Sequence, residues 1–351
     1  MKKVLICVLN WGLGHATRCI PIIREFQRQG FTVDIASDGG PLELLRMEFP
    51  TARFHELPEY SITYPTNNII INVGRRMFTL LQAVREEHKT IERIADREKY
   101  DIVVSDNRYG CYASHTYNIF ITHQVNILTP GNVLDPAVNT FNHRYIRKYD
   151  ECWVPDFEES PALSGRLGHD HDLEHVRYIG PVSRMEKRTG ATKFKLAAVI
   201  SGPEPQRTLI ETELRKQMPD LPYPTALIGG VVSKVAPQND TGRMRHFPFL
   251  TSAELNQVMA ESEIIVCRGG YTTVMDLVAL GKKAICIPTP GQTEQEYLTK
   301  MYEKRGYFIR QTQEKIDLRS AVNQIDQYTG IPLQIQPELL RNAVKSLVHI
   351  R

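Results

Sequence analysis

Long apolar runs are missing from this sequence of 351 residues, since no stretch approaches the ~20 apolar residues that a membrane-spanning helix needs. The apolar run near the start, Val4–Leu9, has six residues and ends at Asn10, so it is shorter than the core of a secretory signal peptide. The six cysteines are scattered and include no C-x-x-C pair, which argues against a disulfide framework and favours a reducing compartment. We therefore expect a cytoplasmic protein, and a peripheral contact with the inner face of the cell membrane stays open.

A large excess of either charge is missing too. The sequence has 43 Lys and Arg against 40 Asp and Glu, a formal net charge of +3, so nothing in it requires a nucleic-acid partner. Hydrophobic residues make up 42% and charged residues 24%, which is ordinary globular usage and excludes a disordered or collagen-like chain. At roughly 100–200 residues per domain, the length predicts two domains.

Short apolar runs alternate with amphipathic stretches along most of the chain, a rhythm typical of parallel sheets covered by helices on both faces. In the first half, strands are predicted at Val4–Leu9, Phe31–Ser37, Asp101–Ser105, Asn118–Thr122 and Glu151–Val154, and helices at Thr17–Gln29, Pro41–Met47 and Arg75–Ala95. In the second half, strands are predicted at Leu196–Ser201, Thr225–Ile228, Glu263–Cys267 and Lys283–Pro288, and helices at Arg207–Gln217, Leu255–Glu261 and Thr272–Leu280. The sequence thus predicts two α/β domains in tandem.

The composition shifts between about residues 160 and 192, where a polar run, His169–Asp172, is followed by Gly180-Pro181 and then by a basic stretch. We place the inter-domain linker here, with domains at 1–182 and 183–335 and a last helix at 336–351. The histidines of this segment could bind a metal, but a solvated linker is favoured, and no metal site is predicted.

The first candidate site lies directly after the first predicted strand, in a loop that holds Gly12, Gly14 and His15. Ligands of parallel sheets bind at the carboxyl ends of strands, and the glycines let the backbone turn tightly and approach a ligand closely. The start of a helix lowers the pKa of His15, which favours the neutral imidazole that a general base needs. A structural turn with a capping histidine is the alternative. Asp106 ends another strand of the same domain and could serve as the base, orient the imidazole, or cap its own loop.

The second candidate site joins the strand that ends near Arg268 to the next helix. Gly269 and Gly270 expose backbone N–H groups there, and the helix begins near Thr272, so the turn could bind a diphosphate. Asp276, one turn further on, could accept hydrogen bonds from ribose hydroxyls, although a carboxylate in the first turns also suits the helix dipole with no ligand present.

A third cluster follows the predicted strand Lys283–Pro288. Gln292, Gln295 and Glu296 gather at a helix start and could contact several sugar hydroxyls at once. A solvated helix N-terminus rich in acid and amide side chains is the alternative for this cluster.

Together these segments resemble glycosyltransferases of the GT-B fold, which have two Rossmann-like domains facing a central cleft. The likeness is greatest to the family of the bacterial N-acetylglucosaminyltransferase that completes the lipid-linked peptidoglycan precursor, whose C-terminal domain defines glycosyltransferase family 28. The residues that carry it are Cys267-Arg268-Gly269-Gly270, Asp276, Pro288, Gln292, Gln295-Glu296 and Gly306, together with Gly12–His15. The resemblance implies that the first half binds the acceptor and the second half binds a UDP-sugar, which is a substrate, so no cofactor is expected.

The resemblance also implies roles for single residues. Arg207 would lie near the nucleotide, and Phe249-Leu250 would lay the uracil against the backbone. Gly269, Gly270, Tyr271 and Thr272 would hold the diphosphate. Asp276 stands where the family has a ribose-binding Glu, and Gln295-Glu296 stands where it has a Gln-Gln pair that contacts the sugar.

The reaction implied by the resemblance is an inverting, metal-independent transfer to a hydroxyl of a lipid-linked or saccharide acceptor. His15 would be the base and the turn at Gly269–Thr272 would stabilise the leaving diphosphate, with Arg207 and Arg268 facing it. Two other functions stay open, a non-hydrolysing UDP-sugar 2-epimerase and a non-catalytic nucleotide-sugar-binding protein. The acceptor, the donor sugar and the oligomeric state also stay open.

Two apolar segments have alternative interpretations. Ile69–Ile71 beside Arg75-Arg76 could be an interfacial patch for a lipid-linked acceptor, or a buried strand followed by a helix start. Pro337–Arg351 is amphipathic, and both core packing and membrane contact would account for its apolar face.

Overall fold

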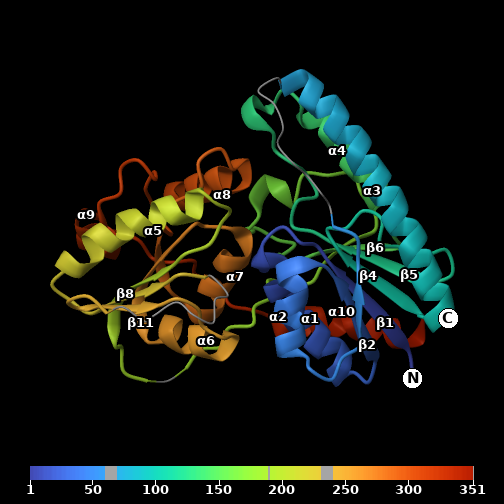
Figure 1. Cartoon of the computed structure of the whole chain (residues 1–351), viewed down its shortest axis with the longest axis horizontal. Helices are drawn as coiled ribbons and strands as arrows, with labels where there is room; N and C mark the ends of the chain where they lie inside the picture. The colour runs from blue at the N-terminus through green and yellow to red at the C-terminus, as the bar shows by residue number, and fades with distance from the viewer. Residues whose placement is uncertain (60–68, 189, 231–239, 351) are drawn as a thin grey trace. The chain divides into compact units, whose positions relative to one another are not determined.

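The chain folds into two compact units (Figure 1). The computed structural model describes residues 1–59, 69–188, 190–230 and 240–350, and in the helix that begins at Ile69 it describes side chains from residue 80 on. Unit 1 comprises Met1–Ile127, Val133–Val182 and Gln336–Arg351, and unit 2 comprises Leu128–Asn132 and Ser183–Ile335.

Unit 1 is built on a parallel sheet of seven strands in the order β3-β2-β1-β4-β5-β6-β7. These strands are β1 (Lys3–Val8), β2 (Thr32–Ser37), β3 (Phe54–Glu56), β4 (Ile102–Asp106), β5 (Tyr117–Ile121), β6 (Glu151–Val154) and β7 (Val176–Tyr178). The central strands are buried along nearly their whole length, as expected for strands covered on both faces.

The helices of unit 1 are α1 (Leu13–Arg28), α2 (Gly39–Glu48), α3 (Ile69–Glu98), α4 (Asp135–Ile146) and α10 (Pro337–Ser346), with short 3₁₀ turns at Gly165–Leu167 and Leu347–His349. A further 3₁₀ turn, Pro130–Asn132, belongs to unit 2. α3 packs on one face of the sheet, where Ile91 and Ala95 join a core with Leu5 and Val103. α1 places Phe26 against the β6 residue Trp153, and the two rings stack with centroids 6.1 Å apart.

Unit 2 is built on a second parallel sheet, with six strands in the order β10-β9-β8-β11-β12-β13. These strands are β8 (Phe194–Val199), β9 (Thr225–Ile228), β10 (Met244–Phe247), β11 (Ser262–Cys267), β12 (Lys283–Cys286) and β13 (Ile309–Arg310). The helices are α5 (Gln206–Gln217), α6 (Ser252–Ala260), α7 (Tyr271–Leu280), α8 (Thr293–Lys304) and α9 (Leu318–Gln324), with 3₁₀ turns at Met218–Asp220 and Ile325–Gln327. α5 and α9 cover one face of this sheet, where Ile210 and Leu318 join its core.

Both sheets have the strand order of a Rossmann-like domain, which confirms the predicted α/β fold class with two such domains. In each unit the order reverses beside the first strand, between β1 and β4 in unit 1 and between β8 and β11 in unit 2. Ligands of open α/β sheets bind outside the carboxyl ends of the strands at such a point. The candidate loops after β1 and β4, and those after β8 and β11, therefore lie at the expected ligand-binding edge of their own sheets.

The two units divide between Val182 and Ser183, inside the 160–192 segment in which we place the linker. The part at 160–180, however, belongs to the folded unit 1. It contributes β7 to the edge of the first sheet and buries Leu163, Ser164 and Leu167. His169 contacts Asp156, with 3.3 Å between its Nε2 and Oδ2, so the polar run is part of the folded unit. Polar composition misled the prediction because these side chains hydrogen-bond within the fold.

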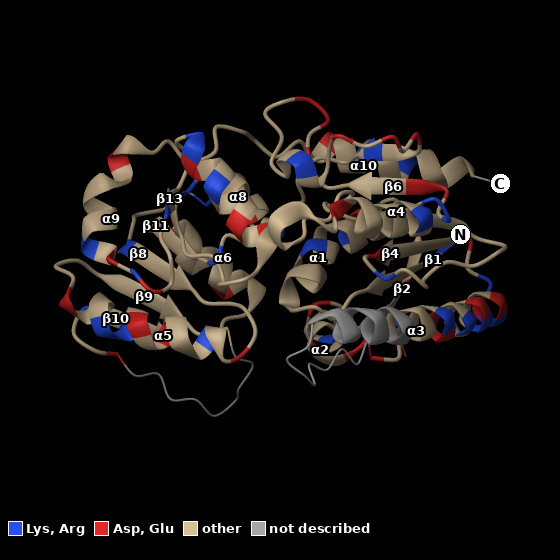
Figure 2. Ribbon diagram, turned by 90° about the horizontal axis from the view of Figure 1, so that it is seen from above, with Lys and Arg blue, Asp and Glu red and all other residues tan. Residues whose placement is uncertain are grey.

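The alternative of a buried strand at Ile69–Ile71 is wrong, because α3 begins at Ile69, six residues before the predicted start of the helix at Arg75. The side chains proposed for an interfacial patch there lie outside the described part. From residue 80 on, acidic and basic residues are interspersed along α3 (Figure 2).

The C-terminal helix α10 packs on α1 within unit 1. Leu340, Val344 and Leu347 are buried, so core packing accounts for most of the apolar face that the sequence shows, while Val348 is 40% exposed. Among the described residues, no helix is long and apolar enough to cross a lipid bilayer.

Candidate active site

The loop between β1 and α1 presents the predicted histidine. Gly12 adopts φ +82°, a conformation that favours glycine, and α1 begins at the next residue, Leu13. His15 therefore lies in the first turn of α1, and its side chain is 13% exposed. Gly14 lies beside it in the same turn and accepts a hydrogen bond from the Thr17 hydroxyl at 3.0 Å.

The structure brings His15 and Asp106 together from positions 91 residues apart. His15 Nδ1 lies 2.8 Å from Asp106 Oδ2, and Asp106 is fully buried at the end of β4. Strand register accounts for this contact, because Val8 at the end of β1 is the parallel neighbour of Asp106. An ionised carboxylate only accepts hydrogen bonds, so Nδ1 carries the proton in this bond and Nε2 keeps its lone pair.

The electrostatics of the pair favour a neutral imidazole beside an ionised carboxylate. Burial and then the positive charge of Arg18 lower the pKa of His15 below its ordinary value, and Asp106 offsets this only in part. Burial alone would raise the pKa of Asp106, but Arg18 and His15 outweigh it, so the pKa lies below its ordinary range. These are the charge states that a histidine base oriented by an aspartate requires.

In unit 2 the turn between β11 and α7 needs its glycine. Gly269 has φ +71°, and a Cβ at this position would lie 2.4 Å from Thr299 Cγ2. Gly270 is the N-cap residue of α7 and has no side chain to cap the first turn, which includes Tyr271 and Thr272; the N–H of Tyr271 donates to Glu294 Oε1 at 3.4 Å. Backbone N–H groups at a helix N-terminus form a favourable environment for an anion.

Arg268 is buried beneath this turn, where its guanidinium joins three loops at the carboxyl edge of the sheet. It donates to Ser201 O at 3.4 Å and to Gln206 O, both after β8, and to Ile287 O at 3.4 Å, after β12. A further bond reaches Gln313 Oε1 at 2.6 Å. Burial lowers the pKa of Arg268 to about 10, so it is still a cation at neutral pH. Its contacts hold the loops of the candidate donor site in place.

Asp276 lies in the second turn of α7 and is 8% exposed. Ser183 Oγ donates to Asp276 Oδ1 at 2.5 Å, which uses one carboxylate oxygen. Burial raises the pKa of Asp276 to about 6, and both Arg184 and the bond from Ser183 act in the opposite direction.

Replacing this acid by its amide is expected to change how stability depends on pH. An acid whose folded-state pKa is raised loses stability as the pH rises from its unfolded pKa, about 3.9, to its folded pKa, here about 6. Asp276→Asn has no such loss. The free energy of unfolding of the variant minus that of the parent should therefore be larger at pH 7.5 than at pH 4.5, by roughly 1–3 kcal/mol. Urea denaturation at both pH values measures it, with exposed Asp326→Asn as the control; a difference that does not change with pH would contradict the expectation.

The third predicted cluster lies at the start of α8. Gln295 Oε1 accepts from the backbone N–H of Thr289 at 2.8 Å, and a Cβ built on Gly270 would lie 3.8 Å from Gln295 Nε2, so this amide adjoins the α7 turn. Glu296 Oε1 accepts from Gly291 N at 2.9 Å, while Gln292 is the exposed N-cap residue of α8 and makes no side-chain capping bond. The structure therefore brings Gln295 to the predicted diphosphate turn.

Arg207 lies in the first turn of α5, after the loop that follows β8. Its guanidinium forms ion pairs with Glu204 and with Glu211, the latter at 3.2 Å, and Nη1 lies 3.4 Å from Gly229 O. A diphosphate near Arg207 would compete with two carboxylates for this cation.

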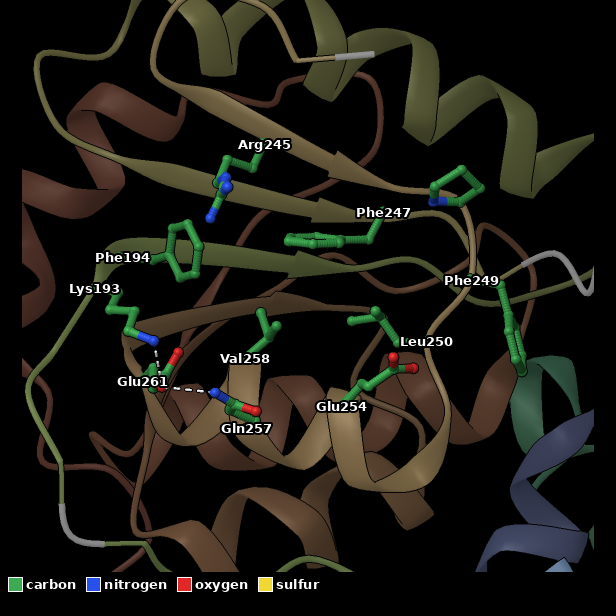
Figure 3. A pocket seen from close by; sticks show the side chains of 11 residues that line it. Lys193, Phe194, Arg245, Phe247, Phe249, Leu250, Glu254, Gln257, Val258 and Glu261 are labelled. Atoms are coloured by element: carbon green, nitrogen blue, oxygen red, sulfur yellow. Dashed lines mark hydrogen bonds and ion pairs between the residues drawn. The ribbon is translucent and has the colours of Figure 1, made fainter. Parts of the chain in front are cut away.

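Phe249 and Leu250 follow the end of β10, before α6. They line a pocket of about 430 Å³ between the sheet and α6, which Phe247 of β10 and Val258 of α6 also line. In Figure 3 the Leu250 side chain extends into the space above α6, and the Phe249 ring lies at its outer end. The predicted pair thus lines one end of a pocket whose walls are both polar and apolar, and the lining continues to Lys193 and Phe194 at the start of β8.

Two residues beside His15 were missed by the sequence analysis. Arg18 is 2% exposed and contacts both His15 and Asp106, and its Nη1 lies 3.0 Å from His123 Nδ1. Helical spacing could have identified Arg18, three residues after His15, and His123 follows a predicted strand just as Asp106 ends one.

Comparisons with known proteins agree with this geometry. Residues 190–346 match the family model described as glycosyltransferase family 28 C-terminal domain. A protein of Methanosarcina mazei named as an uncharacterized glycosyltransferase is 23% identical over 329 residues, which cover 87% of this chain and 84% of the relative. A Haemophilus ducreyi UDP-N-acetylglucosamine–N-acetylmuramyl-(pentapeptide) pyrophosphoryl-undecaprenol N-acetylglucosamine transferase is 21% identical over 320 residues, covering 86% and 82%.

Solved structures show the same fold over the full length. The crystal structure of Acinetobacter baumannii MurG superposes with a TM-score of 0.59 at 14% identity and covers 100% of both chains. The glycosyltransferase VinC, solved in complex with dTDP, superposes with a TM-score of 0.54 at 11% identity and covers 98% of this chain and 94% of VinC. This protein is therefore a glycosyltransferase of the GT-B fold that resembles the MurG family, and its C-terminal half matches glycosyltransferase family 28.

Proposed function

We propose that this glycosyltransferase moves a sugar from a UDP-sugar to a hydroxyl group of its acceptor, with inversion and without a metal ion. The single observation that carries the proposal is the contact of His15 with buried Asp106, 2.8 Å apart at the carboxyl edge of the first sheet. A histidine oriented in this way can remove the proton of an acceptor hydroxyl as it attacks the anomeric carbon. Direct attack with loss of the nucleoside diphosphate inverts the anomeric configuration.

The base in this proposal is His15, and Asp106 orients it. Asp106 is fully buried, and both of its oxygens are engaged, one by Arg18 and one by His15. An acceptor that approaches from solvent would contact the partly exposed imidazole and not the buried carboxylate. After proton transfer, the imidazolium would be stabilised by the neighbouring carboxylate.

The leaving diphosphate would bind at the N-terminus of α7. The N–H groups after Gly269 and the partial positive charge of the helix end offset the charge that develops as the glycosidic bond breaks. This arrangement needs no cation for the leaving group, and Arg207 would assist by exchanging a carboxylate partner for a phosphate oxygen.

UDP rather than dTDP is proposed because Asp276 would bind the ribose. Ser183 occupies one of its oxygens, and the other could accept a hydrogen bond from a ribose hydroxyl. VinC was solved with dTDP, which has one hydroxyl fewer on its pentose, so the two nucleotides provide a direct comparison. The name of the H. ducreyi relative specifies a pyrophosphoryl-undecaprenol acceptor, and that of the M. mazei relative specifies none. For this protein a lipid-linked or a saccharide hydroxyl fits the proposal.

Thermal-shift measurements test donor binding. We expect UDP to raise the melting temperature, dTDP to raise it less, and one UDP-sugar among UDP-glucose, UDP-galactose and UDP-N-acetylglucosamine to raise it most. Ligand at 100 times its Kd stabilises the native state by about 2.7 kcal/mol. If none of these nucleotides changes the melting temperature, the proposed donor class is wrong.

Product analysis tests the reaction itself. With the best-stabilising UDP-sugar and a panel of saccharide and prenyl-phosphate acceptors, UDP release should depend on acceptor and persist in EDTA, and the new bond should have the inverted configuration. A change of the sugar in the absence of acceptor would instead identify a 2-epimerase, and loss of activity in EDTA would contradict metal independence.

A further inference from the structure

Arg18 is a buried cation with no assigned role, on the same side of α1 as His15. The two residues are three positions apart, which places them one helical turn apart on one face. Arg18 is 2% exposed, and a buried arginine is costly unless its charge is paired and its donors are bonded. Its partners should therefore reveal what it does.

The guanidinium of Arg18 contacts three side chains, those of Asp106, His15 and His123. Nε donates to Asp106 Oδ1 at 2.8 Å, and Nη2 contacts the same oxygen. Nη2 also lies 3.0 Å from His15 Nδ1, but both atoms carry protons when Nδ1 donates to Asp106, so this is a close contact and not a hydrogen bond. Nη1 lies 3.0 Å from His123 Nδ1. Because a guanidinium only donates, His123 accepts at Nδ1. This bond holds Nη1, the guanidinium nitrogen that does not contact Asp106.

The contacts divide the two oxygens of Asp106 between two partners. Arg18 takes Oδ1 through a planar fork, so Oδ2 is left for His15 and the carboxylate is held in that orientation. A lysine could supply the charge but not the fork, because its ammonium is a point donor.

The same cation acts on the imidazole. The charged and titratable groups that act on His15 are Arg18 on the same helix, Asp106 at the end of β4 and His123 after β5. Arg18 opposes the protonation of His15, whereas Asp106 favours it. Without Arg18, no neighbouring cation would offset the effect of the Asp106 carboxylate on His15. The pKa of His15 would then rise, and the imidazolium would form at a higher pH.

We propose that Arg18 is the positioning residue of the site, which orients Asp106 toward His15 and keeps the imidazole uncharged so that it can act as a base. This inference rests on the proposed function for the role of His15 as base, but the arrangement itself can be measured without any substrate.

The test follows the His15 ring protons by NMR in the full chain, with the signal assigned by its loss in His15→Gln. In Arg18→Met, the titration midpoint of His15 should rise by roughly 1–3 pH units, because an uncompensated carboxylate then adjoins the imidazole. In Arg18→Met/Asp106→Asn, which removes both charges, the midpoint should return toward that of the parent. Arg28→Met, on the same helix but exposed, is the matched control and should leave it unchanged.

A purely structural role predicts a different result. In that case Arg18→Met would lower the melting temperature without moving the His15 midpoint, and this outcome would overturn the proposal. If Arg18→Met does not fold, Arg18→Gln, which removes the charge but keeps a polar side chain, decides: the proposal requires its His15 midpoint to rise by roughly 1–3 pH units, and an unchanged midpoint would contradict it.

Kinetics then separate this inference from the proposed function. The substrate is the UDP-sugar that gives the largest thermal shift. In Arg18→Met the acidic limb of the kcat/KM profile should move to higher pH by as much as the NMR midpoint does. At a given pH on that limb, each pH unit of movement lowers kcat/KM tenfold. If the His15 titration midpoint rises but the acidic limb of kcat/KM does not move, Arg18 acts as inferred but His15 is not the base.

Discussion

His15→Ala is expected to lower kcat by roughly 10²–10⁴-fold, the contribution typical of a general base. The imidazole is the partly exposed member of a cluster whose carboxylate is fully buried, so no neighbouring group can take its proton-accepting role directly. Donor binding should be retained, because the predicted diphosphate turn belongs to the other unit. UDP release at saturating acceptor, measured beside the thermal shift with UDP, distinguishes the two effects.

The control for this substitution is His175→Ala. His175 is also partly buried in unit 1 and its Nε2 lies 3.3 Å from Ile146 O, but it directly precedes β7 and so lies at the opposite, amino edge of the sheet. This variant should keep its turnover. Turnover of His15→Ala equal to that of the parent at saturating acceptor would exclude His15 as the base.

Gly269→Ala is expected to abolish the thermal shift with UDP and to destabilise unit 2. The new Cβ would lie 2.4 Å from Thr299 Cγ2, and φ +71° is unfavourable for alanine. These two costs together should lower the free energy of unfolding by roughly 2–4 kcal/mol, and relief of the clash would move the turn that presents its N–H groups. Urea denaturation and the UDP thermal shift measure the two effects.

A second substitution can separate the clash from the backbone conformation. Thr299→Ser removes only the methyl group that the new Cβ would meet, and a serine hydroxyl can keep the bond to Gln295 O, 2.7 Å in the parent. In Gly269→Ala/Thr299→Ser we therefore expect part of the stability and of the UDP shift to return. Gly306→Ala, with φ +69° and no atom within 4 Å of the new Cβ, should cost only about 1–2 kcal/mol and keep the shift. A full UDP shift in Gly269→Ala itself would show that the turn does not hold the diphosphate.

Local sequence patterns predicted the elements that carry the site but missed weaker ones. The strands at β1, β4 and β11 are buried apolar runs, which periodicity detects without knowledge of their neighbours. β3, β7, β10 and β13 were missed because they have two to four residues and lie toward the sheet edges, where pairing with a neighbouring strand rather than apolar content defines them.

Burial changed the interpretation of several charged residues. Arg268 was expected to face a diphosphate, but most of its donors hold the loops after β8 and β12. Arg207 pairs with two glutamates that helical spacing alone made available. For Arg268 the sequence shows only that a charge is present, because its partners depend on which strand ends become neighbours.

The sequence by itself determined the α/β class, the glycine turn at Gly269-Gly270 and the position of His15 after a buried strand, because these depend on local periodicity and backbone freedom. Only the tertiary structure decided that Asp106 lies 2.8 Å from His15 and that Arg18 lies between Asp106 and His123. The physical reason is the strand order: pairing of β1 with β4, and of β4 with β5, brings distant strand ends to one edge of the sheet. Because these side chains are buried, each charge strongly shifts the pKa of its neighbours.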